Sequence, residues 1–300
     1  MSGYVAIINP AAGGGRSGRE GPRALRTLRE AKVDLDDIRY TRAAGDAQRI
    51  AREAWQQGAR RFLVVGGDGT THEVINGCVP EALSGEERPT IAMLPLGTGN
   101  SFLRDFGIFD AKGALAAIER GTARSSDVVR LDHEDGALLS FNIVGLGFSA
   151  TVGARANARY KRFGALGYVV AVFETAMNLQ APVFPLRLDG GELDSRPTTL
   201  LSFSNSRFTG GAMEMAPRAK IDDGELDVIR ISSMPRLRFV AQFPSIFRGK
   251  HTETSVVEEK RARRVDFEIN ETIDCMIDGE IVRVRPRAVE VVPRAFSVVA

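Results

Sequence analysis

Short apolar segments run directly into glycine-rich segments at three places in the first hundred residues. Tyr4–Ile8, Phe62–Val65 and Thr90–Leu94 are runs of mostly apolar residues, several of them β-branched, as is typical of buried strands. The glycine-rich segments are Asn9–Arg16 (NPAAGGGR), Gly66–Val74 (GGDGTTHEV) and Leu94–Asn100 (LPLGTGN), and each breaks the strand before it. Between the runs lie helical patterns, one expected to start at Pro22 and another to be capped by Asp46. This alternation predicts a doubly wound α/β domain with a mostly parallel sheet.

After about residue 125 the pattern changes to short apolar segments separated by Asp-Gly turns. The expected strands are Val128–Leu131, Ala137–Val144, Val183–Leu188, Thr198–Ser204, Leu226–Ile231, Val265–Ile269, Thr272–Ile277 and Ile281–Val284. Helical segments interrupt them near Phe163–Leu179 and Arg236–Phe247. We therefore expect an α/β nucleotide-binding domain over residues 1–125 and a β-sandwich over 126–288. The apolar end, residues 289–300, can return to the first domain.

Composition excludes several classes of protein. The chain has 40 Lys+Arg and 38 Asp+Glu, so its net charge of +2 gives no general electrostatic case for binding nucleic acid. Its longest apolar stretch is shorter than the roughly 20 residues that span a bilayer, and the first residues lack the basic start of a signal peptide. Cys78 and Cys275 are far apart and lack metal-site spacing. We expect a cytoplasmic protein without a transmembrane segment.

The three glycine-rich segments predict a site for a polyphosphate. In an open α/β sheet, ligands bind beyond the carboxyl ends of the strands, where glycine lets backbone N–H groups approach an anion. GxxxxGK[ST] is absent, which disfavours a P-loop site, whereas GGGRSG at Gly13–Gly18 matches GxGxxG, a pattern that is weak evidence when it stands alone. Asp68 would repel phosphates unless a divalent cation lay between, so it is either an Mg²⁺ ligand or a turn aspartate. Thr70 and Thr98 can donate to phosphate or cap helices.

The same motifs carry a resemblance to a known family. NPAAGGGR, GGDGTTHEV and LPLGTGNSFLRDF together resemble the diacylglycerol kinase catalytic-domain family, which includes bacterial lipid kinases of the YegS type, sphingosine kinases and ceramide kinases. The resemblance continues through IVGLGFSA at Ile143–Ala150, IDDGELDV at Ile221–Val228 and IDGE at Ile277–Glu280. GGDGT alone is less specific, since NAD kinases and phosphofructokinase-like proteins are similar there. The resemblance implies an N-terminal domain of that NAD kinase/phosphofructokinase-like kind and a C-terminal β-sandwich.

The resemblance also implies which residues form the site. Those assigned to ATP are Asn9, Thr41, Gly66, Gly67, Asp68, Gly69, Thr70, Thr71, His72, Glu73, Gly97, Thr98 and Asn100. Asp68 and Glu280 are the implied catalytic residues, with Glu280 as the base. A structural Mg²⁺ would be bound by the carboxylate of Asp223 and the backbone carbonyls of Lys220 and Glu225. Read from the residues alone, Asp223 and Asp278 are as easily plain turn formers.

Glu280 differs from those aspartates because the turn before it is complete without it. A glutamate there can accept the proton of an alcohol that attacks the γ-phosphate of ATP. His72 stands where bacterial diacylglycerol kinases often have asparagine and where sphingosine kinases also have histidine, which leaves its role open. His133 and His251 lie outside every motif and are expected at the surface.

The resulting hypothesis is an ATP- and Mg²⁺-dependent lipid kinase that phosphorylates a lipid hydroxyl at the inner membrane surface. Diacylglycerol is the first choice of acceptor, with a sphingoid base or ceramide left open, as is a homodimer. The basic residues from Arg155 to Arg162 before Phe163–Phe173, and a second basic cluster at Arg261–Arg264, can dock on anionic lipid or simply belong to a packed helix and a solvated turn. The alternatives are an NAD kinase-like phosphotransferase and a catalytically silent nucleotide- or lipid-binding regulator.

Overall fold

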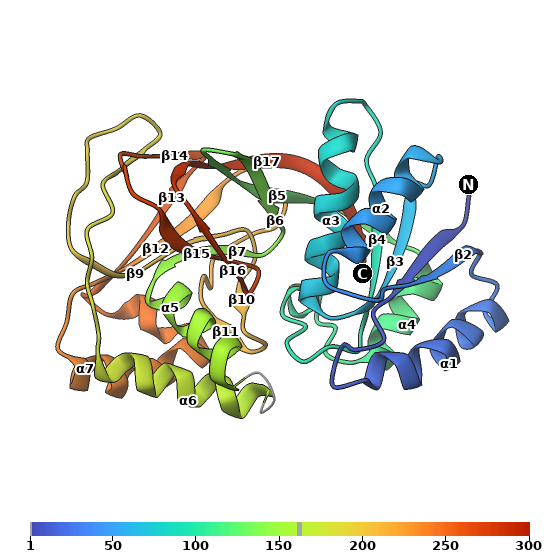
Figure 1. Ribbon diagram of the computed structural model, residues 1–300, viewed down its shortest axis with the longest axis horizontal. Helices are drawn as coiled ribbons and strands as arrows, with labels where there is room; N and C mark the ends of the chain where they lie inside the picture. The colour runs from blue at the N-terminus through green and yellow to red at the C-terminus, as the bar shows by residue number, and fades with distance from the viewer. Residues whose placement is uncertain (1, 161–163) are drawn as a thin grey trace. The chain divides into compact units, whose positions relative to one another are not determined.

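The computed structural model describes residues 2–160 and 164–300 and divides into two compact units (Figure 1). Unit 1 comprises Met1–Asp127 together with Pro293–Ala300, and unit 2 comprises Val128–Val292. The chain passes from unit 1 to unit 2 along β5 (Ala123–His133) and returns along β17 (Pro286–Val299). Both ends of the chain therefore belong to unit 1.

Unit 1 contains a parallel sheet with neighbouring strands in the order β2-β1-β3-β4. The strands are β1 (Tyr4–Ile8), β2 (Leu35–Tyr40), β3 (Arg61–Gly66) and β4 (Thr90–Pro95). The end of β17 adds a further parallel strand, in which Ser297 pairs with Thr90. β1, β3 and β4 are buried along most of their length, as their continuous apolar runs predict for a sheet covered on both faces.

Helices follow the strands in alternation, which confirms the predicted α/β fold. They are α1 (Arg16–Glu30), α2 (Asp46–Gln56), α3 (Asp68–Leu83), the 3₁₀ helix η1 (Phe102–Phe106) and α4 (Ala111–Arg120). α2 packs against α3, and α1 contacts α4 (Figure 1). Two expected starts are wrong: α1 begins before Pro22, at Arg16, and Gly45 rather than Asp46 is the N-cap of α2.

Unit 2 contains two sheets. The first is an antiparallel sheet in the order β13-β12-β9-β7-β15-β16, and in the second β6, β5, β17, β14 and β8 are neighbours in that order. The strands of the first are β7 (Ile143–Gly147), β9 (Thr198–Ser204), β12 (Leu226–Ser232), β13 (Val257–Ala262), β15 (Ile273–Ile277) and β16 (Glu280–Val284). The second adds β6 (Gly136–Ser140), β8 (Leu186–Leu188) and β14 (Arg264–Phe267). β10 (Phe208–Thr209) and β11 (Met213–Glu214) form a separate small ribbon.

Alternate side chains of the first sheet enter two different cores. Val144, Leu201 and Phe203 pack with Val129 and Val265 of the second sheet, which makes the predicted β-sandwich. Residues of the opposite parity, including Ile143, Leu200, Ile229 and Met276, pack against helices on the other face. These helices are α5 (Phe148–Arg155), the π-helical turn η2 (Ala156–Tyr160), α6 (Gly164–Met177), α7 (Arg236–Gln242), and the 3₁₀ helices η4 (Phe243–Arg248) and η5 (Lys250–Glu253). Among the described residues, no helix is both long and apolar enough to cross a membrane.

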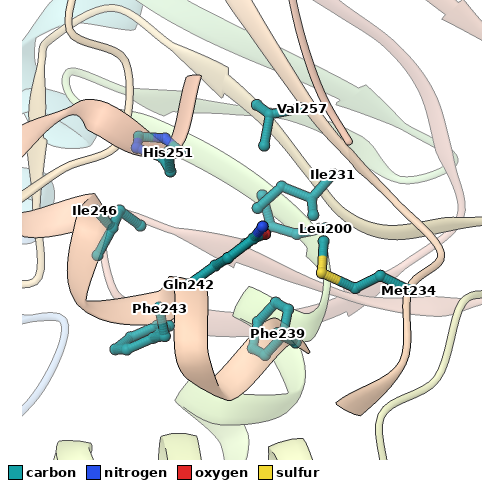
Figure 2. Close-up of a pocket in the computed structure, with 9 residues that line it drawn as sticks. All are labelled: Leu200, Ile231, Met234, Phe239, Gln242, Phe243, Ile246, His251 and Val257. Carbon is teal, nitrogen blue, oxygen red and sulfur yellow. The ribbon is translucent and has the colours of Figure 1, made fainter. Parts of the chain in front are cut away.

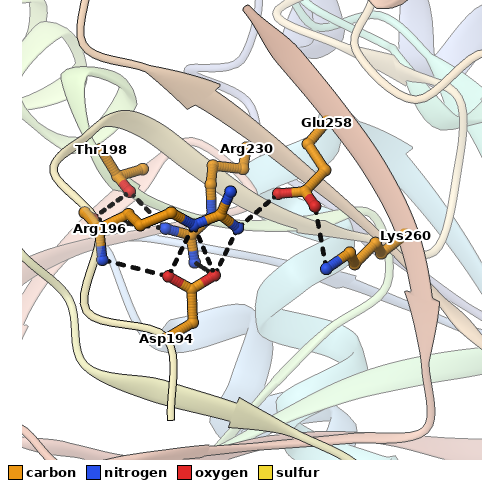
Figure 3. Close-up of polar contacts among 6 residues, drawn as sticks. All are labelled: Asp194, Arg196, Thr198, Arg230, Glu258 and Lys260. Carbon is orange, nitrogen blue, oxygen red and sulfur yellow. Dashed lines mark hydrogen bonds and ion pairs between the residues drawn. The ribbon is translucent and has the colours of Figure 1, made fainter. Parts of the chain in front are cut away.

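A buried arginine fastens the connection between β8 and β9 to the first sheet (Figure 3). The guanidinium of Arg230, on β12, lies 3.0 Å from Oδ2 of Asp194 and donates to Oγ1 of Thr198 at 2.8 Å. Arg196 binds the same aspartate at 2.6 Å and reaches Glu258 on β13 at 2.7 Å. The hydrogen bond from Arg196 lowers the pKa of Asp194 to about 2, with further contributions from the charges of both arginines. Asp194 is therefore the shared acceptor of two cations.

Candidate functional site

The three predicted glycine-rich loops follow β1, β3 and β4, which are adjacent strands of the unit 1 sheet. The loops contact each other through their backbones. The N–H groups of Leu96 and Gly97 both donate to the carbonyl of Gly66 at 2.8 Å. A Cβ atom on Gly67 would lie 3.0 Å from the Cα of Gly97, so neither position has room for a side chain. The second and third loops are thus fixed against each other at the carboxyl edge of the sheet.

Polar side chains bind the loops together. Oδ2 of Asp68 accepts a hydrogen bond from the backbone N–H of Ser101 at 2.8 Å. Nδ2 of Asn9, at the end of β1, donates to Oγ1 of Thr70 at 3.1 Å. Arg16, the last residue of NPAAGGGR, donates to the carbonyl of Pro95 at 2.8 Å. The side chain of a motif residue therefore links each of the three loops to another. One of the partners, Ser101, directly follows the third loop.

The second and third loops line a small pocket. Its lining includes Gly66, Gly67, Asp68, Thr71, Pro95 and Asn100. α3 begins at Asp68, immediately after β3, so the N-terminal end of its dipole lies at this pocket. The N-cap of this helix is Gly67, which has no side chain to cap the first backbone N–H groups. Such an arrangement favours an anionic ligand.

Further residues assigned to ATP lie in the third loop, after β2 and on α3. Thr98 is exposed in the third loop, and Asn100 donates to the carbonyl of Gly97 at 3.0 Å. Thr41 follows β2 and is buried, with its N–H bonded to Ile8 at the end of β1. It lies at the same edge of the sheet, beside the first loop. His72 lies on α3 one turn before Asn76, whose amide donates to the His72 carbonyl at 3.0 Å.

Glu73 contacts the start of α2. Its two carboxylate oxygens accept the backbone N–H groups of Gly45 and Ala47, each at 2.9 Å. The N-cap of α2 is a glycine and supplies no side-chain acceptor, so the carboxylate of Glu73 satisfies N–H groups that the helix itself leaves open. This contact joins α3 to α2, a structural role that the assignment of Glu73 to nucleotide binding did not anticipate.

In unit 2, Asp278 is more than a turn former. It adopts a positive φ of 50° and is buried. Its carboxylate accepts hydrogen bonds from Oγ of Ser140 at 2.6 Å and from the backbone N–H groups of Phe141, Asn142 and Ile143 at 3.1–3.2 Å. The turn between β15 and β16 is thereby fastened to the link between β6 and β7. Glu280 is exposed two residues later, at the first position of β16.

The DDG turn carries an acidic cluster that sequence reasoning described only in part. Oδ1 of Asp223 accepts the N–H of Glu225 at 3.2 Å, whereas Oδ2 is buried and lacks a hydrogen-bond donor among the described residues. Arg261 of β13 lies 2.9 Å from the Glu225 carboxylate and 3.5 Å from that of Asp223. Burial raises the pKa of the neighbouring Asp227 to about 6. Arg261 and Asp227 were not predicted to belong to this cluster. Arg261 lies on β13, which is far in sequence from β12 but pairs with it, whereas Asp227 lies within IDDGELDV itself.

The expectation that His251 lies at the surface is wrong. The ring is buried in unit 2, and Nε2 lies 3.0 Å from the carbonyl of Met215. Burial lowers the pKa of His251. The residue lies beside apolar helices, an environment that no feature of the surrounding sequence KHTE indicates.

Two family models match the chain. Residues 3–131 match the diacylglycerol kinase catalytic domain, and residues 142–300 match the YegS C-terminal NAD kinase beta sandwich-like domain. The second match alone covers more than half of the chain. Together the two matches account for both units.

Curated proteins and solved structures resemble the chain over nearly its whole length. The diacylglycerol kinase of Mycobacterium tuberculosis is 30% identical over 98% of this chain and 94% of its own. A Chromohalobacter salexigens protein named "Probable lipid kinase YegS-like" is 32% identical over 86% of this chain and 81% of its own. The crystal structure of a Bacillus anthracis strain Sterne protein assigned to the diacylglycerol kinases superposes with a TM-score of 0.81. It is 25% identical and covers 99% of this chain and 94% of its own.

Proposed function

The chain belongs to the kinase family of the diacylglycerol kinase catalytic domain, and from this premise we propose that it transfers the γ-phosphate of ATP to the hydroxyl of a membrane lipid. The observation that carries the proposal is the joining of three glycine-rich loops at the ends of adjacent strands, with Asp68 bonded to Ser101 and Gly67 packed on Gly97. Diacylglycerol is the proposed acceptor because relatives that match more than nine-tenths of the chain are named diacylglycerol kinase. A sphingoid base and ceramide are the other acceptors to test.

ATP is proposed to bind at the carboxyl edge of the unit 1 sheet. Its phosphates would lie against the backbone N–H groups of the second and third loops and the start of α3, where the helix dipole favours negative charge. Asn9 and Thr70 would orient the first loop toward the same phosphates, since their side chains are hydrogen-bonded to each other. Phosphoryl transfer depends mainly on such positioning and on charge neutralisation.

Glu280 is proposed as the base of the reaction. Its carboxylate would accept the proton of the lipid hydroxyl as the hydroxyl oxygen forms a bond to the γ-phosphorus. The bond between that phosphorus and the β,γ-bridging oxygen breaks, and ADP leaves. Glu280 is exposed and stands directly after a turn that Asp278 holds, so its position depends on a fixed backbone.

Magnesium is proposed at two places. At the DDG turn, Oδ2 of Asp223 is buried and accepts no hydrogen bond in the described part of the chain, with Nη1 of Arg261 3.5 Å away, and we propose that it binds a hard cation held also by the carbonyls of Lys220 and Glu225. No group of three or more His, Cys, Asp or Glu side chains in residues 2–160 and 164–300 has a metal-binding arrangement, and a set built on one carboxylate and backbone oxygens does not need one. At the ATP site, a cation beside Asp68 would neutralise phosphate charge.

An assay with γ-labelled ATP and Mg²⁺ tests the activity. Mixed micelles of diacylglycerol, a sphingoid base or ceramide are offered alongside NAD⁺, and label is expected in diacylglycerol. Label in NAD⁺, or ATP binding without any transfer, would contradict the lipid kinase. Glu280→Gln should lose activity by about 10²–10⁴-fold, the usual contribution of a general base, while ATP binding is retained.

The structural Mg²⁺ is tested by thermal unfolding. Mg²⁺ should raise the Tm of the protein above its value in EDTA, and Asp223→Asn should abolish most of that increase. Asp135→Asn is the control because it removes the same charge from an exposed position of unit 2. The proposed cytoplasmic location, with transient contact at the inner membrane, and a homodimer stay predictions, tested by fractionation and light scattering.

A further inference from the structure

We propose that Arg236–Lys250, the segment made of α7, η4 and the first residue of η5, is the surface by which this protein docks on an anionic lipid bilayer. The inference rests on the proposed function, because it assumes that the acceptor lies in a membrane, and it names the surface that reaches it. Three observations carry it: the segment's unpaired cations, its exposed apolar side chains, and the apolar cavity on its inner side.

The cations of this segment have no acidic partner in the described part of the chain. The segment reads RLRFVAQFPSIFRGK and contains no acidic residue. Arg236, Arg238, Arg248 and Lys250 are all exposed, and none of them forms an ion pair with any described residue. Unpaired cations on one short surface attract anionic headgroups.

With the exception of the exposed Arg263, the described basic residues first expected to dock on lipid are, in contrast, paired with acidic residues within the protein. Arg155 and Arg159 lie 3.8 and 2.7 Å from Glu174 on α6. Arg261 pairs with Glu225 at 2.9 Å. Arg264 likewise binds Asp266 and Glu290, at 2.8 and 2.7 Å. Lys161 and Arg162 lie outside the described residues. Because these cations already have acidic partners, we place the docking surface on α7 and η4 and not on these clusters.

Apolar side chains project from the same segment. Leu237 stands between Arg236 and Arg238 and is 79% exposed, and Phe247 precedes Arg248 and is 47% exposed. An apolar tip flanked by cations is typical of segments that lie in a membrane interface, where the charges meet headgroups and the apolar group enters the acyl region. α6 contacts α7 (Figure 1), and its outer face adds the exposed residues Val169, Val170, Phe173 and Met177.

The inner side of the segment lines an apolar cavity (Figure 2). Phe239 and Gln242 of α7 and Phe243 and Ile246 of η4 face Leu200 and Ile231 of the sheet across it. An acyl chain that leaves a bilayer at this segment could bury methylene groups there, each worth about 0.8 kcal/mol of transfer free energy. The cavity therefore favours lipid as the occupant of this face.

Co-sedimentation with vesicles, without ATP, tests docking independently of kinase activity. Wild-type protein should bind vesicles of phosphatidylglycerol and phosphatidylcholine, release at high salt, and bind pure phosphatidylcholine weakly. Leu237→Ser should weaken binding by about tenfold and Arg236→Gln/Arg238→Gln by about thirtyfold. The matched controls are Leu193→Ser, an exposed leucine elsewhere in unit 2, and Arg23→Gln/Arg26→Gln on α1, and both should stay within about twofold of wild type.

Activity measurements separate this inference from the proposed function. With a short-chain diacylglycerol dispersed in water, the docking variants should phosphorylate as fast as wild type, and only their activity on vesicle substrate should fall. Equal vesicle binding by the Leu237 and Leu193 variants, or a wild type that prefers neutral vesicles, would overturn the docking surface. A protein that docks as described but phosphorylates no lipid would overturn the proposed function alone.

Discussion

The backbone of Gly67, at the end of β3, lies against that of Gly97, in the loop after β4, closely enough that a Cβ atom on Gly97 would overlap the Cα of Gly67. The contact joins two loops that are 30 residues apart in sequence and that both line the small pocket region of unit 1. The space that a methyl group would need is occupied by backbone, which cannot rotate away as a side chain can.

Gly97→Ala should therefore separate the two loops. We expect a loss of about 1–3 kcal/mol in the free energy of unfolding, the usual cost of overpacking, and a raised KM for ATP. Gly85→Ala is the control, because the nearest atom to an added Cβ there is 4.0 Å away. Chemical denaturation and initial rates against ATP concentration measure both effects. An alanine at position 97 that leaves stability and KM as in wild type would refute the contact.

Glu73→Ala tests whether this residue serves α2 or the nucleotide. Loss of a carboxylate that accepts two helix N-terminal N–H groups should cost about 1–2 kcal/mol of stability. Glu53→Ala removes a half-buried glutamate of α2 that pairs with Arg49, and should cost less than about 0.5 kcal/mol. Denaturant unfolding and ATP titration distinguish the roles. Unchanged stability with lost ATP affinity would show that Glu73 is a nucleotide ligand after all.

Asp278→Ala should destabilise unit 2 strongly. Four donors, from Ser140 to Ile143, would lose their acceptor in a buried place, and we expect a loss of about 3 kcal/mol or more. Ser140→Ala removes only one of these bonds and should cost about 1 kcal/mol. Glu280→Gln, two residues along but exposed, should leave the free energy of unfolding unchanged. If Asp278→Ala is no more harmful than Ser140→Ala, the backbone donors do not depend on this carboxylate.

Asp194→Asn should reduce stability in a pH-dependent way. Hydrogen bonding to Arg196, together with the charge of Arg230, lowers the pKa of Asp194 from 3.8 to about 2 in the folded protein. The stabilisation is therefore fully present above pH about 4 and is lost as pH falls toward about 2, and it amounts to about 2 kcal/mol at neutral pH. The difference in unfolding free energy between wild type and variant should shrink over that interval in urea titrations. A difference that stays constant from pH about 7 to pH about 2 would mean that the carboxylate is not held in its charged form by these arginines.

The fold was largely predictable because its signals are local. Tyr4–Ile8 and Phe62–Val65 are strands buried on both faces, and such strands show as continuous apolar runs. The glycines that follow them indicate where each strand ends. β13 was not predicted because its sequence, VEEKRA, is charged. It is an edge strand that pairs with β12 in the described sheet.

Parts of the site could not be predicted because they depend on contacts between distant segments. The donors to Asp278 lie more than 130 residues earlier, and those to Glu73 are 26 and 28 residues away. A motif does not indicate which backbone N–H groups will donate hydrogen bonds to its carboxylate. The same holds for His251, whose neighbours in sequence are polar although its spatial neighbours are apolar. Motifs identified which residues carry chemistry, and packing determines which of them also hold the fold together.

The passage of β5 and β17 between the units has a consequence for synthesis on the ribosome. The parallel sheet of unit 1 gains its Ser297–Val299 strand only after all of unit 2 has been translated. At about 5–20 residues per second, β1 to β4 wait roughly ten to forty seconds for that strand, with the free edge of β4 open to other pairings. Unit 2, encoded without interruption, can fold during this delay. We expect nascent chains of this protein to depend on chaperones at the apolar edge of β4 until the last residues emerge.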